Sequence, residues 1–193
     1  MKILFTLFFL FFSFSVFSDD ISDFEIEGIS IGDSLLDYFT LEEIESNKRE
    51  TSYKKKDYIK YEFLYLSFFK TYDGIQVFTK SNDKSYKIES LSGAIFYNNI
   101  DACLTDKDTI VSSINKLFDK SVSFFDEGIK NHASDKTGKS KTYSVYFDFS
   151  SGDYIKVRCA DWSKGIEEDY GWSDNLAIIM TTNQFNQWVN TAY

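Results

Sequence analysis

Proline is absent from the 193 residues, and histidine occurs once, at His132. Arginine is scarce as well, since Arg49 and Arg158 are the only two among 21 basic side chains. Both biases follow codon composition, so we interpret them as the imprint of an AT-rich genome. With one histidine, any catalytic triad or imidazole-assisted hydrolysis has to use His132. No GxSxG-type elbow accompanies it, and we interpret it as a surface residue in a polar loop.

Long apolar runs are missing except at the N-terminus, from Ile3 to Phe17. This run has about 15 residues, fewer than the roughly 20 that a bilayer-spanning helix needs. Small residues precede a cleavage point after Ser18, so we predict that residues 1–18 are a signal peptide. The mature protein is then periplasmic or secreted. An uncleaved anchor is the alternative, and the absence of a cysteine after the run disfavours bacterial lipid attachment.

Cysteine is limited to Cys103 and Cys159. Nothing resembles a CxxC redox motif, and two cysteines with one histidine are a poor ligand set for zinc. In an exported protein an even number of cysteines favours a disulfide. We therefore predict a Cys103–Cys159 bond, which stabilises the fold by about 4 kcal/mol in the chain-entropy treatment. Two unpaired buried thiols are the alternative, and no cofactor is predicted.

Positive charge is in deficit, because 30 acidic side chains outnumber 21 basic ones and give a net charge of −9. Nucleic acids and anionic membrane surfaces favour partners with positive charge. We therefore predict that the protein binds no nucleic acid and that the mature chain does not insert stably into a membrane. Another envelope protein or a small ligand is the partner we expect.

Residues 24–45 carry the clearest local signals. Phe24 and Ile26 alternate with acidic residues, and the alternation changes phase after Gly28, which predicts a bulge or tight bend. Two short helical segments follow, each preceded by side chains that cap helices. The capping candidates are Asp33 or Ser34 for the first segment and the pair Thr40 and Glu43 for the second, over Leu41 to Ile44.

Alternating apolar residues predict two sets of three strands, each set preceded by a helix. Asp73-Gly74 predicts a hairpin turn in the first set, and Gly93 a bulge. Apolar spacing over 110–118, with a capping pair at Thr105 and Asp108, predicts the central helix. The expected strands span 59–66, 75–80 and 86–97, then 143–149, 154–160 and 176–181, and a C-terminal helix begins at Thr182 or Asn183.

These signals predict the α+β class, with antiparallel sheet formed by two helix-plus-three-stranded-meander units and helices packed on one face. We expect one domain over 19–193, with a pseudo-repeat of roughly 24–97 and 103–181 and a C-terminal helix over 183–193. Aromatic residues make up 19% of the chain. Most fall at alternating strand positions, which indicates core packing; a carbohydrate-stacking surface is the alternative.

Candidate site residues concentrate in an acidic loop over 161–174. Clustered carboxylates are the ligands that calcium prefers, although the spacing matches no EF-hand and charge runs usually face water. Together with the polar loop 126–142, the same side chains are also candidates for hydrolysis by carboxylates. The candidate residues are Asp161, Glu167, Glu168, Asp169 and Asp174.

Four segments resemble a family of small exported proteins from streamlined, AT-rich marine alphaproteobacteria that has no assigned activity. They are FEIEGISIGDSLLDYF at 24–39, DKTGKS at 135–140, YFDFSSGD at 146–153 and CADWS at 159–163. This resemblance implies a periplasmic address and no functional residues.

A second, more local likeness concerns GISIGDSLLDYF at 28–39. It resembles the Gly-x-x-x-Gly-x-Ser opening of small outer-membrane-assembly lipoproteins and of β-lactamase inhibitor protein. Those proteins have helix-then-antiparallel-sheet folds and bind other proteins, but the chain lacks the anchoring cysteine of the lipoproteins. The leading hypothesis is a non-enzymatic periplasmic binding or envelope-interaction module, and the alternative is a periplasmic hydrolase that uses the loop carboxylates.

Overall fold

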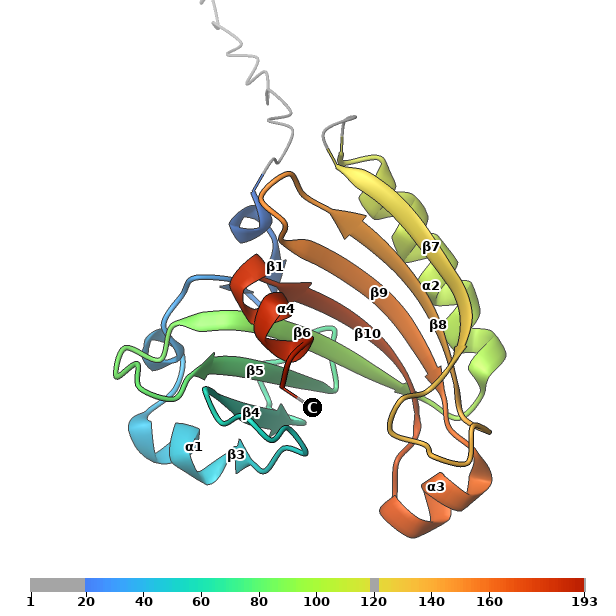
Figure 1. Ribbon diagram of the computed structural model, residues 1–193, viewed down its shortest axis with the longest axis horizontal. Helices are drawn as coiled ribbons and strands as arrows, with labels where there is room; N and C mark the ends of the chain where they lie inside the picture. Colours follow the sequence, from blue (N-terminus) through green and yellow to red (C-terminus); the bar gives the residue numbers. More distant parts are fainter. Residues whose placement is uncertain (1–19, 119–121, 193) are drawn as a thin grey trace, which may run out of the picture.

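In the computed structural model the protein is described over residues 20–118 and 122–192 (Figure 1). The predicted signal peptide lies outside these residues. The short elements of the first third are η1 (Ile21–Asp23), β1 (Glu25–Ile26), β2 (Ile29–Ser30), η2 (Leu35–Asp37), α1 (Leu41–Ser46) and β3 (Lys48–Arg49). They are followed by β4 (Tyr58–Leu64), β5 (Gly74–Lys80), β6 (Ile88–Tyr97), α2 (Ile100–Asn115), β7 (Ser123–Asn131), β8 (Lys141–Asp148), β9 (Tyr154–Asp161), α3 (Lys164–Tyr170), β10 (Asp174–Thr181) and α4 (Asn183–Val189).

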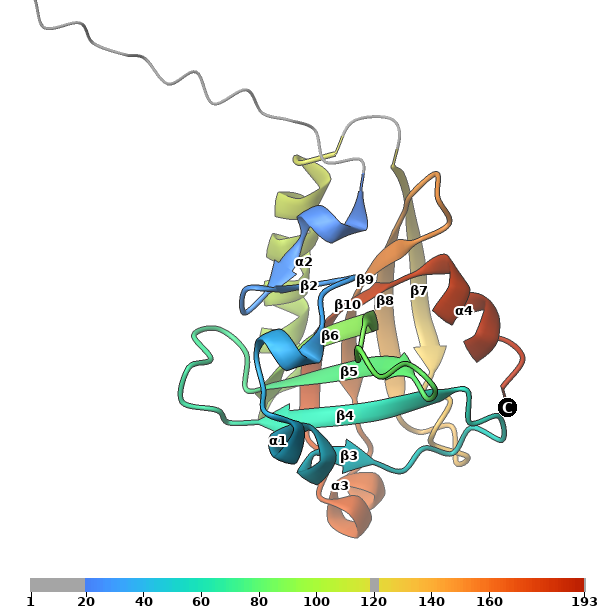
Figure 2. The same ribbon diagram turned by 90° about the vertical axis from the view of Figure 1, so that its left-hand side faces the viewer.

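One antiparallel sheet holds eight of the described strands in the order β3-β4-β5-β6-β10-β9-β8-β7. The predicted α+β class and the C-terminal helix are therefore confirmed. The sheet consists of two halves, β3 to β6 and β7 to β10, which join where Ser90–Tyr97 pairs with Asp174–Thr181. Figures 1 and 2 show the sheet curling, with α2 on its outer side. Whether the halves arose by duplication stays a prediction.

The main core lies between the sheet and α2 with the N-terminal segment. Strand side chains alternate between faces, and on β9 Ile155, Val157 and Cys159 are buried on this side. The apolar side chains of residues 21–44 cover the half formed by β4, β5 and β6, while α2 covers β9, β10 and part of β6. The disulfide between Cys103 on α2 and Cys159 on β9, with Cα atoms 6.1 Å apart, is as predicted.

The C-terminal helix α4 lies on the other face of the sheet, so the expectation that the helices share one face does not hold for it. Phe185 and Trp188 of α4 pack with Tyr58 and Phe78. Val77 belongs to the main core and faces the α2 side of the sheet. Because neighbouring residues of a strand point to opposite faces, Phe78 points away from α2. This second apolar cluster covers only one end of that face and leaves the rest of it open.

Several local structures predicted from the sequence are confirmed. Thr40 and Glu43 make a capping box at the start of α1, and the Ser34 hydroxyl accepts a hydrogen bond from the Leu36 amide at the start of η2. At Gly28 the chain makes a tight hairpin between β1 and β2, in which Glu27 and Gly28 both have positive φ. Thr182 caps α4 through the Phe185 amide.

Other boundaries differ from the predictions. Helix α2 is capped by Asn99 rather than Thr105. Residues 65–73 form a longer loop before Gly74 in place of the predicted tight turn. Glu27 accepts hydrogen bonds from three amides of that loop, at Lys70, Thr71 and Tyr72. Gly93 pairs regularly with Ile75 and Ile178, so it is no bulge. Two predicted loops contain regular elements: β7 occupies 126–131 of the first, and α3 lies within the second.

Within residues 20–118 and 122–192, no helix has both the length and the apolar character needed to cross a membrane.

Candidate ligand-binding groove

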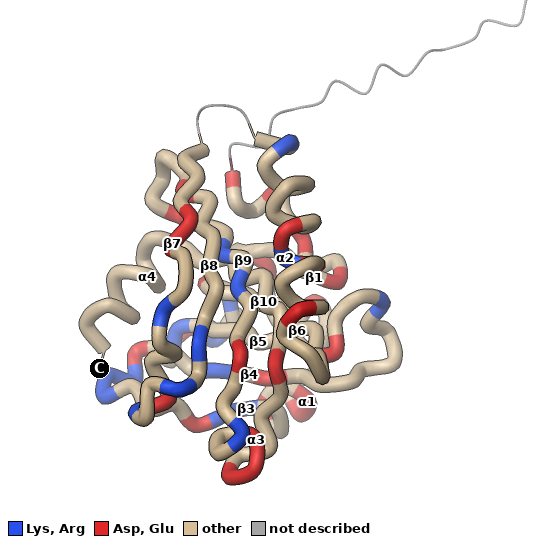
Figure 3. Tube along the Cα trace, turned by 90° about the vertical axis from the view of Figure 1, so that its right-hand side faces the viewer, with Lys and Arg blue, Asp and Glu red and all other residues tan. Residues whose placement is uncertain are grey.

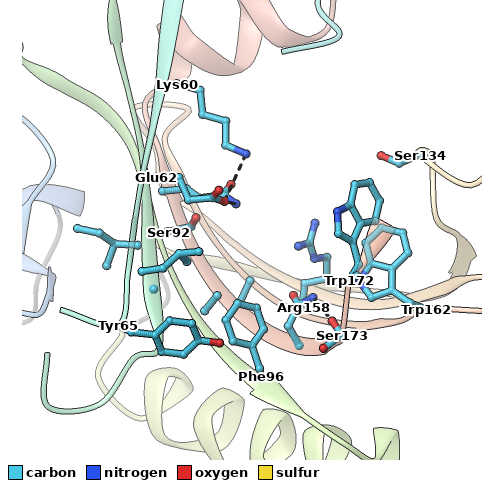
Figure 4. Close-up of a pocket in the computed structure, with 18 of the residues that line it drawn as sticks. Lys60, Glu62, Tyr65, Ser92, Phe96, Ser134, Arg158, Trp162, Trp172 and Ser173 are labelled. Atoms are coloured by element: carbon cyan, nitrogen blue, oxygen red, sulfur yellow. Dashed lines mark hydrogen bonds and ion pairs between the residues drawn. The ribbon is translucent and has the colours of Figure 1, made fainter. Parts of the chain in front are cut away.

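A groove of about 520 Å³ lies on the sheet face that α2 leaves open (Figure 4). Its volume falls within the range of roughly 300–1,000 Å³ that is typical of small-ligand sites. Side chains from β4, β5, β6, β9 and β10 form its floor and one wall. The opposite wall comes from two loops that are far apart in the sequence, one at His132 and Ser134 and the other at Trp162 and 171–173.

The floor is a row of small residues in register across four strands. Arg158 of β9 is paired with Ala177 of β10, Ala177 with Ala94 of β6, and Ala94 with Gly74 of β5. Cross-strand partners in a sheet project to the same face. Because Ala177 and Ala94 have small side chains, the space above them stays open, whereas the Leu64 side chain covers Gly74 and would lie 2.5 Å from a Cβ atom there. Arg158 is the one long side chain of this row.

Arg158 projects between the two walls (Figure 4). Its Nε is buried and has no hydrogen-bond partner, and no carboxylate of the described residues lies within ion-pair distance of its guanidinium. Burial lowers the pKa of the guanidinium, yet arginine stays charged because its ordinary pKa lies above 12. The groove therefore contains an uncompensated positive charge.

Two further basic groups lie beside this charge. Burial and the nearby Arg158 lower the pKa of Lys156 to about 8, while its Nζ donates a hydrogen bond of 2.6 Å to the Tyr146 hydroxyl. The same two causes, with a contribution from Lys156, lower the pKa of His132 to about 4. At neutral pH the imidazole is therefore uncharged, and Arg158 with Lys156 supplies the positive potential.

The loop wall is aromatic. Trp162 contacts His132 and Trp172, with ring centroids 3.9 Å and 4.6 Å apart, and Trp172 contacts Tyr170 at 5.2 Å. Trp172 remains 41% exposed, so part of its indole is free to contact a ligand. Aromatic rings in this setting offer flat apolar surface with little conformational freedom to lose.

Buried hydrogen bonds hold the two loops together. The Asp135 carboxylate accepts from the Thr137 and Ser140 amides and from the Ser140 hydroxyl, all at 2.7–2.8 Å, and these hydrogen bonds hold its pKa well below the ordinary value. The Ser140 hydroxyl also accepts from the Ser163 amide, at 3.0 Å. The second loop is thereby tied to the first, which brings Trp162 against His132.

Helix α3 aims the second tryptophan. It ends at Tyr170 and is capped by Gly171, whose left-handed conformation, φ 67°, lets its amide donate a hydrogen bond to the Glu167 carbonyl at 2.9 Å. Glycine adopts this conformation without a steric penalty. The chain then reverses at the groove and places Trp172 beside Trp162 (Figure 4).

The strand wall is of mixed character. Tyr65 and Phe96 form its apolar part, with ring centroids 6.1 Å apart. Glu62 is the one carboxylate among the described residues that line the groove. Its charge is compensated, since it accepts a 2.7 Å hydrogen bond from Gln76 and lies 3.7 Å from the Lys60 amine and 3.6 Å from Arg49.

The acidic candidates from the sequence do not line this groove. Asp161 and Asp174 share strand parity with Cys159 and Leu176, which face α2, and Glu167, Glu168 and Asp169 lie on α3. Asp174 accepts a hydrogen bond from the Trp162 amide at 2.8 Å, so it helps to position the aromatic wall. Among the described residues, no three acidic, histidine or cysteine side chains form a group that could hold a metal ion.

Sequence reasoning named the two loops but missed the side chains that matter in them. The loops do converge in one groove, and they bring aromatic rings to it rather than carboxylates. His132 is half-buried against Trp162 rather than a free surface residue. One signal was available: Arg158 is one of only two arginines in a chain rich in lysine, and it lies within a predicted strand, on the face opposite Val157 and Cys159.

Comparison with known proteins gives no further guide, because no family model, curated protein or solved structure matches this chain. The chemistry of the groove therefore has to be judged from its own residues.

Proposed function

We propose that the protein is a non-enzymatic, exported binding module and that the groove over Ala177 and Ala94 is its site for a small ligand. The observation that carries this proposal is Arg158, a half-buried cation without a carboxylate partner, aimed into an open groove. A buried charge without a partner costs stability. A fold selected for stability alone would place an apolar or neutral residue at this position, so a role toward a ligand accounts for the arginine.

Binding is favoured over hydrolysis by the groups that line the groove. Hydrolysis by carboxylates generally needs a second acidic group near the reacting bond, and Glu62 is the one carboxylate lining the described groove. Gln76, Lys60 and Arg49 already engage it. The one histidine, with a pKa lowered to about 4, is a weak general base at neutral pH.

Export is part of the proposal and has its own support. The apolar run Ile3–Phe17 has the length and flanks of a signal peptide. The Cys103–Cys159 disulfide suits an oxidising compartment such as the periplasm. Both observations are consistent with the leading hypothesis of an envelope protein.

A filled groove provides the test. Purified protein lacking residues 1–18 is dialysed against the low-molecular-weight extract of the cells that produce it, and retained compounds are identified by mass spectrometry. The comparison variant is Ala94→Leu, whose side chain occupies the groove floor. We expect at least one compound to be retained by the unsubstituted protein and lost from the variant.

Two results would contradict the proposal. Equal retention by both proteins would place binding elsewhere, and retention of nothing by either would leave the groove without a ligand. Hydrolysis of chromogenic glycosides or esters that disappears in Asp161→Asn or Glu168→Gln would support the enzyme alternative instead.

A further inference from the structure

We infer that the groove takes a ring compound that bears a carboxylate, with the carboxylate on Arg158 and one ring face against Trp162 and Trp172. This inference rests on the proposed binding function and specifies the chemical class of the ligand. It combines two parts of the site that have different chemistry, Arg158 at the end of the floor and the aromatic loop wall, and each makes a separate prediction.

The first step concerns the charge. A guanidinium presents several N–H donors in a planar fork that matches the two oxygens of a carboxylate. In the described protein no carboxylate uses the donors of Arg158, and its Nε is buried without a partner. A ligand carboxylate would pair with the Arg158 guanidinium, which has no carboxylate partner among the described residues.

The second step concerns the field around Arg158. The protein as a whole has a net charge of −9, but basic residues gather on the strand ends and loop beside the groove. Figure 3 shows blue segments along the ends of β7 and β8, where lysines cluster. A cleft with positive potential on a negative molecule attracts anions selectively. The basic residues beside the groove are Lys130, Lys136, Lys139 and, on the groove face, Lys156, whereas Lys141 pairs with Asp161 and shares the face of the sheet that α2 covers.

The third step decides between a singly and a doubly charged ligand. Among the described residues, the cations that line the groove are Lys60 and Arg158; Lys60 already lies 3.7 Å from Glu62, which leaves Arg158 as the unpaired one. Glu62 faces Arg158 from the other wall (Figure 4). A phosphate carries nearly two negative charges at neutral pH and would be repelled by Glu62 more strongly than a carboxylate. One unpaired cation in the lining fits one negative charge, and Lys156, which lies beside the groove without lining it, adds to the surrounding positive potential.

The fourth step concerns the body of the ligand. Trp162 and Trp172 lie with ring centroids 4.6 Å apart at an interplanar angle of 59°, so together they form an angled apolar surface. Tyr65 and Phe96 face them across the groove. A flat ring between these walls would bury apolar area on both sides. An aromatic acid and a sugar acid share this chemistry, and the experiment separates them.

The experiment uses five probes at neutral pH, measured by isothermal titration calorimetry on the protein lacking residues 1–18. 2-Naphthoate is compared with 2-naphthol, and D-glucuronate with D-glucose, so that each pair differs mainly in the carboxylate. We expect one acid to bind at least tenfold more tightly than its neutral counterpart, and the pair that shows this difference identifies the kind of ring. 2-Naphthyl phosphate is expected to bind more weakly than 2-naphthoate.

Two variants test the contributions of Arg158 and of the aromatic wall separately. Arg158→Met should weaken binding of the acid at least tenfold and abolish the preference for acid over neutral probe. Trp172→Leu should weaken both members of a pair and leave their ratio unchanged. Lys84→Met, which removes an exposed cation from the turn between β5 and β6, should bind like the unsubstituted protein. Circular dichroism establishes that each variant is folded.

Three outcomes overturn the inference: neither acid binds, acid and neutral probes bind equally, or the preference survives Arg158→Met. The acid preference of the unsubstituted protein decides the matter if Arg158→Met does not fold. If the probes fail while the cell extract yields a neutral compound that Ala94→Leu does not retain, the inference is wrong and the proposed binding function stands.

Discussion

Arg158 on β9 is the direct cross-strand neighbour of Ala177 on β10. Ala94 and Gly74 continue the same row on β6 and β5. Sheet faces that pack against another layer usually carry larger apolar side chains, as the opposite face does at Val157 and Leu91. The row therefore keeps room above the sheet, and the arginine occupies one end of that room. Because the floor residues lie on the face opposite the main core, they can be substituted without disturbing that core.

Filling the floor should abolish binding and spare the fold. In Ala94→Leu the added side chain enters the open groove, so the free energy of unfolding should change by about 1 kcal/mol or less. Binding of 2-naphthoate, or of the compound retained from the cell extract, should fall at least tenfold. Calorimetric titration and urea unfolding measure the two quantities. Ala102→Leu, an exposed position on α2, is the matched control and should leave binding intact.

Lys156 should reduce stability in a pH-dependent way. Its pKa is lowered from 10.5 to about 8, chiefly by burial, so between these values the unfolded chain binds more protons than the folded one. The contribution of Lys156 to the free energy of unfolding of the parent protein therefore rises as the pH increases through this window. Lys156→Met should raise the free energy of unfolding by about 1–3 kcal/mol at pH 7, and the gain should shrink toward pH 10.

Urea unfolding followed by circular dichroism at both pH values measures this effect. Differences between variant and parent cancel the titrations of tyrosines that do not contact Lys156, such as Tyr58, Tyr61 and Tyr72, because their raised pKa values affect both proteins alike. The loss of the hydrogen bond and cation–π contact with Tyr146 opposes the gain. A variant less stable than its parent at pH 7 would mean that these contacts outweigh the burial of the charge. Lys84→Met should change little at either pH.

The fold class and the local turns and helix caps could be predicted from the sequence because they depend on residues that are close together in the chain. The Thr40–Glu43 capping box, the turn at Gly28 and the cap at Thr182 involve residues within a few positions of each other. Strand alternation likewise predicted most of the sheet. The position of α4 was not predictable in this way, since it depends on which strand face remains uncovered after α2 and the N-terminal segment have packed.

The groove was beyond sequence reasoning for the same physical reason. It requires β6 and β10 to pair with each other, and that pairing joins residues that are 77 to 91 positions apart. Strand β7 was also missed: all its described residues but one are exposed, so its burial lacks the alternation that marks a half-buried strand. Its bulge between Asp126 and Gly128 interrupts the pattern further.

Removing the disulfide should lower stability substantially. The bond joins residues 56 positions apart, and closing a loop of that length in the unfolded chain corresponds to about 4 kcal/mol. The double variant Cys103→Ala/Cys159→Ala and the chemically reduced protein should both lose free energy of unfolding of that order. Denaturant unfolding with and without reductant measures it. Reductant should have no effect on the double variant. The prediction would be refuted if the double variant or the reduced parent had the same unfolding midpoint as the oxidised parent.

Gly93 should tolerate no side chain, because of what packs on it from the α2 side of the sheet. A Cβ atom at this position would lie 2.5 Å from the Tyr72 ring and 2.8 Å from the Ile26 side chain, which is buried in the main core. Ordinary contacts between carbon atoms are about 3.5–4.0 Å, so one of these side chains has to move. Overpacking of this kind costs about 1–3 kcal/mol, and Gly93→Ala should lower the free energy of unfolding by that amount.

Gly165 provides the matched comparison within the same protein. It lies in α3, and a Cβ there would meet no atom within 4 Å. Alanine favours a helix over glycine by about 0.5–1 kcal/mol, so Gly165→Ala should stabilise the protein slightly where Gly93→Ala destabilises it. Gly93 faces away from the groove, so its variant, while folded, should bind 2-naphthoate as the parent does. Equal stability of the two variants would show that Tyr72 and Ile26 do not pack on Gly93 as described.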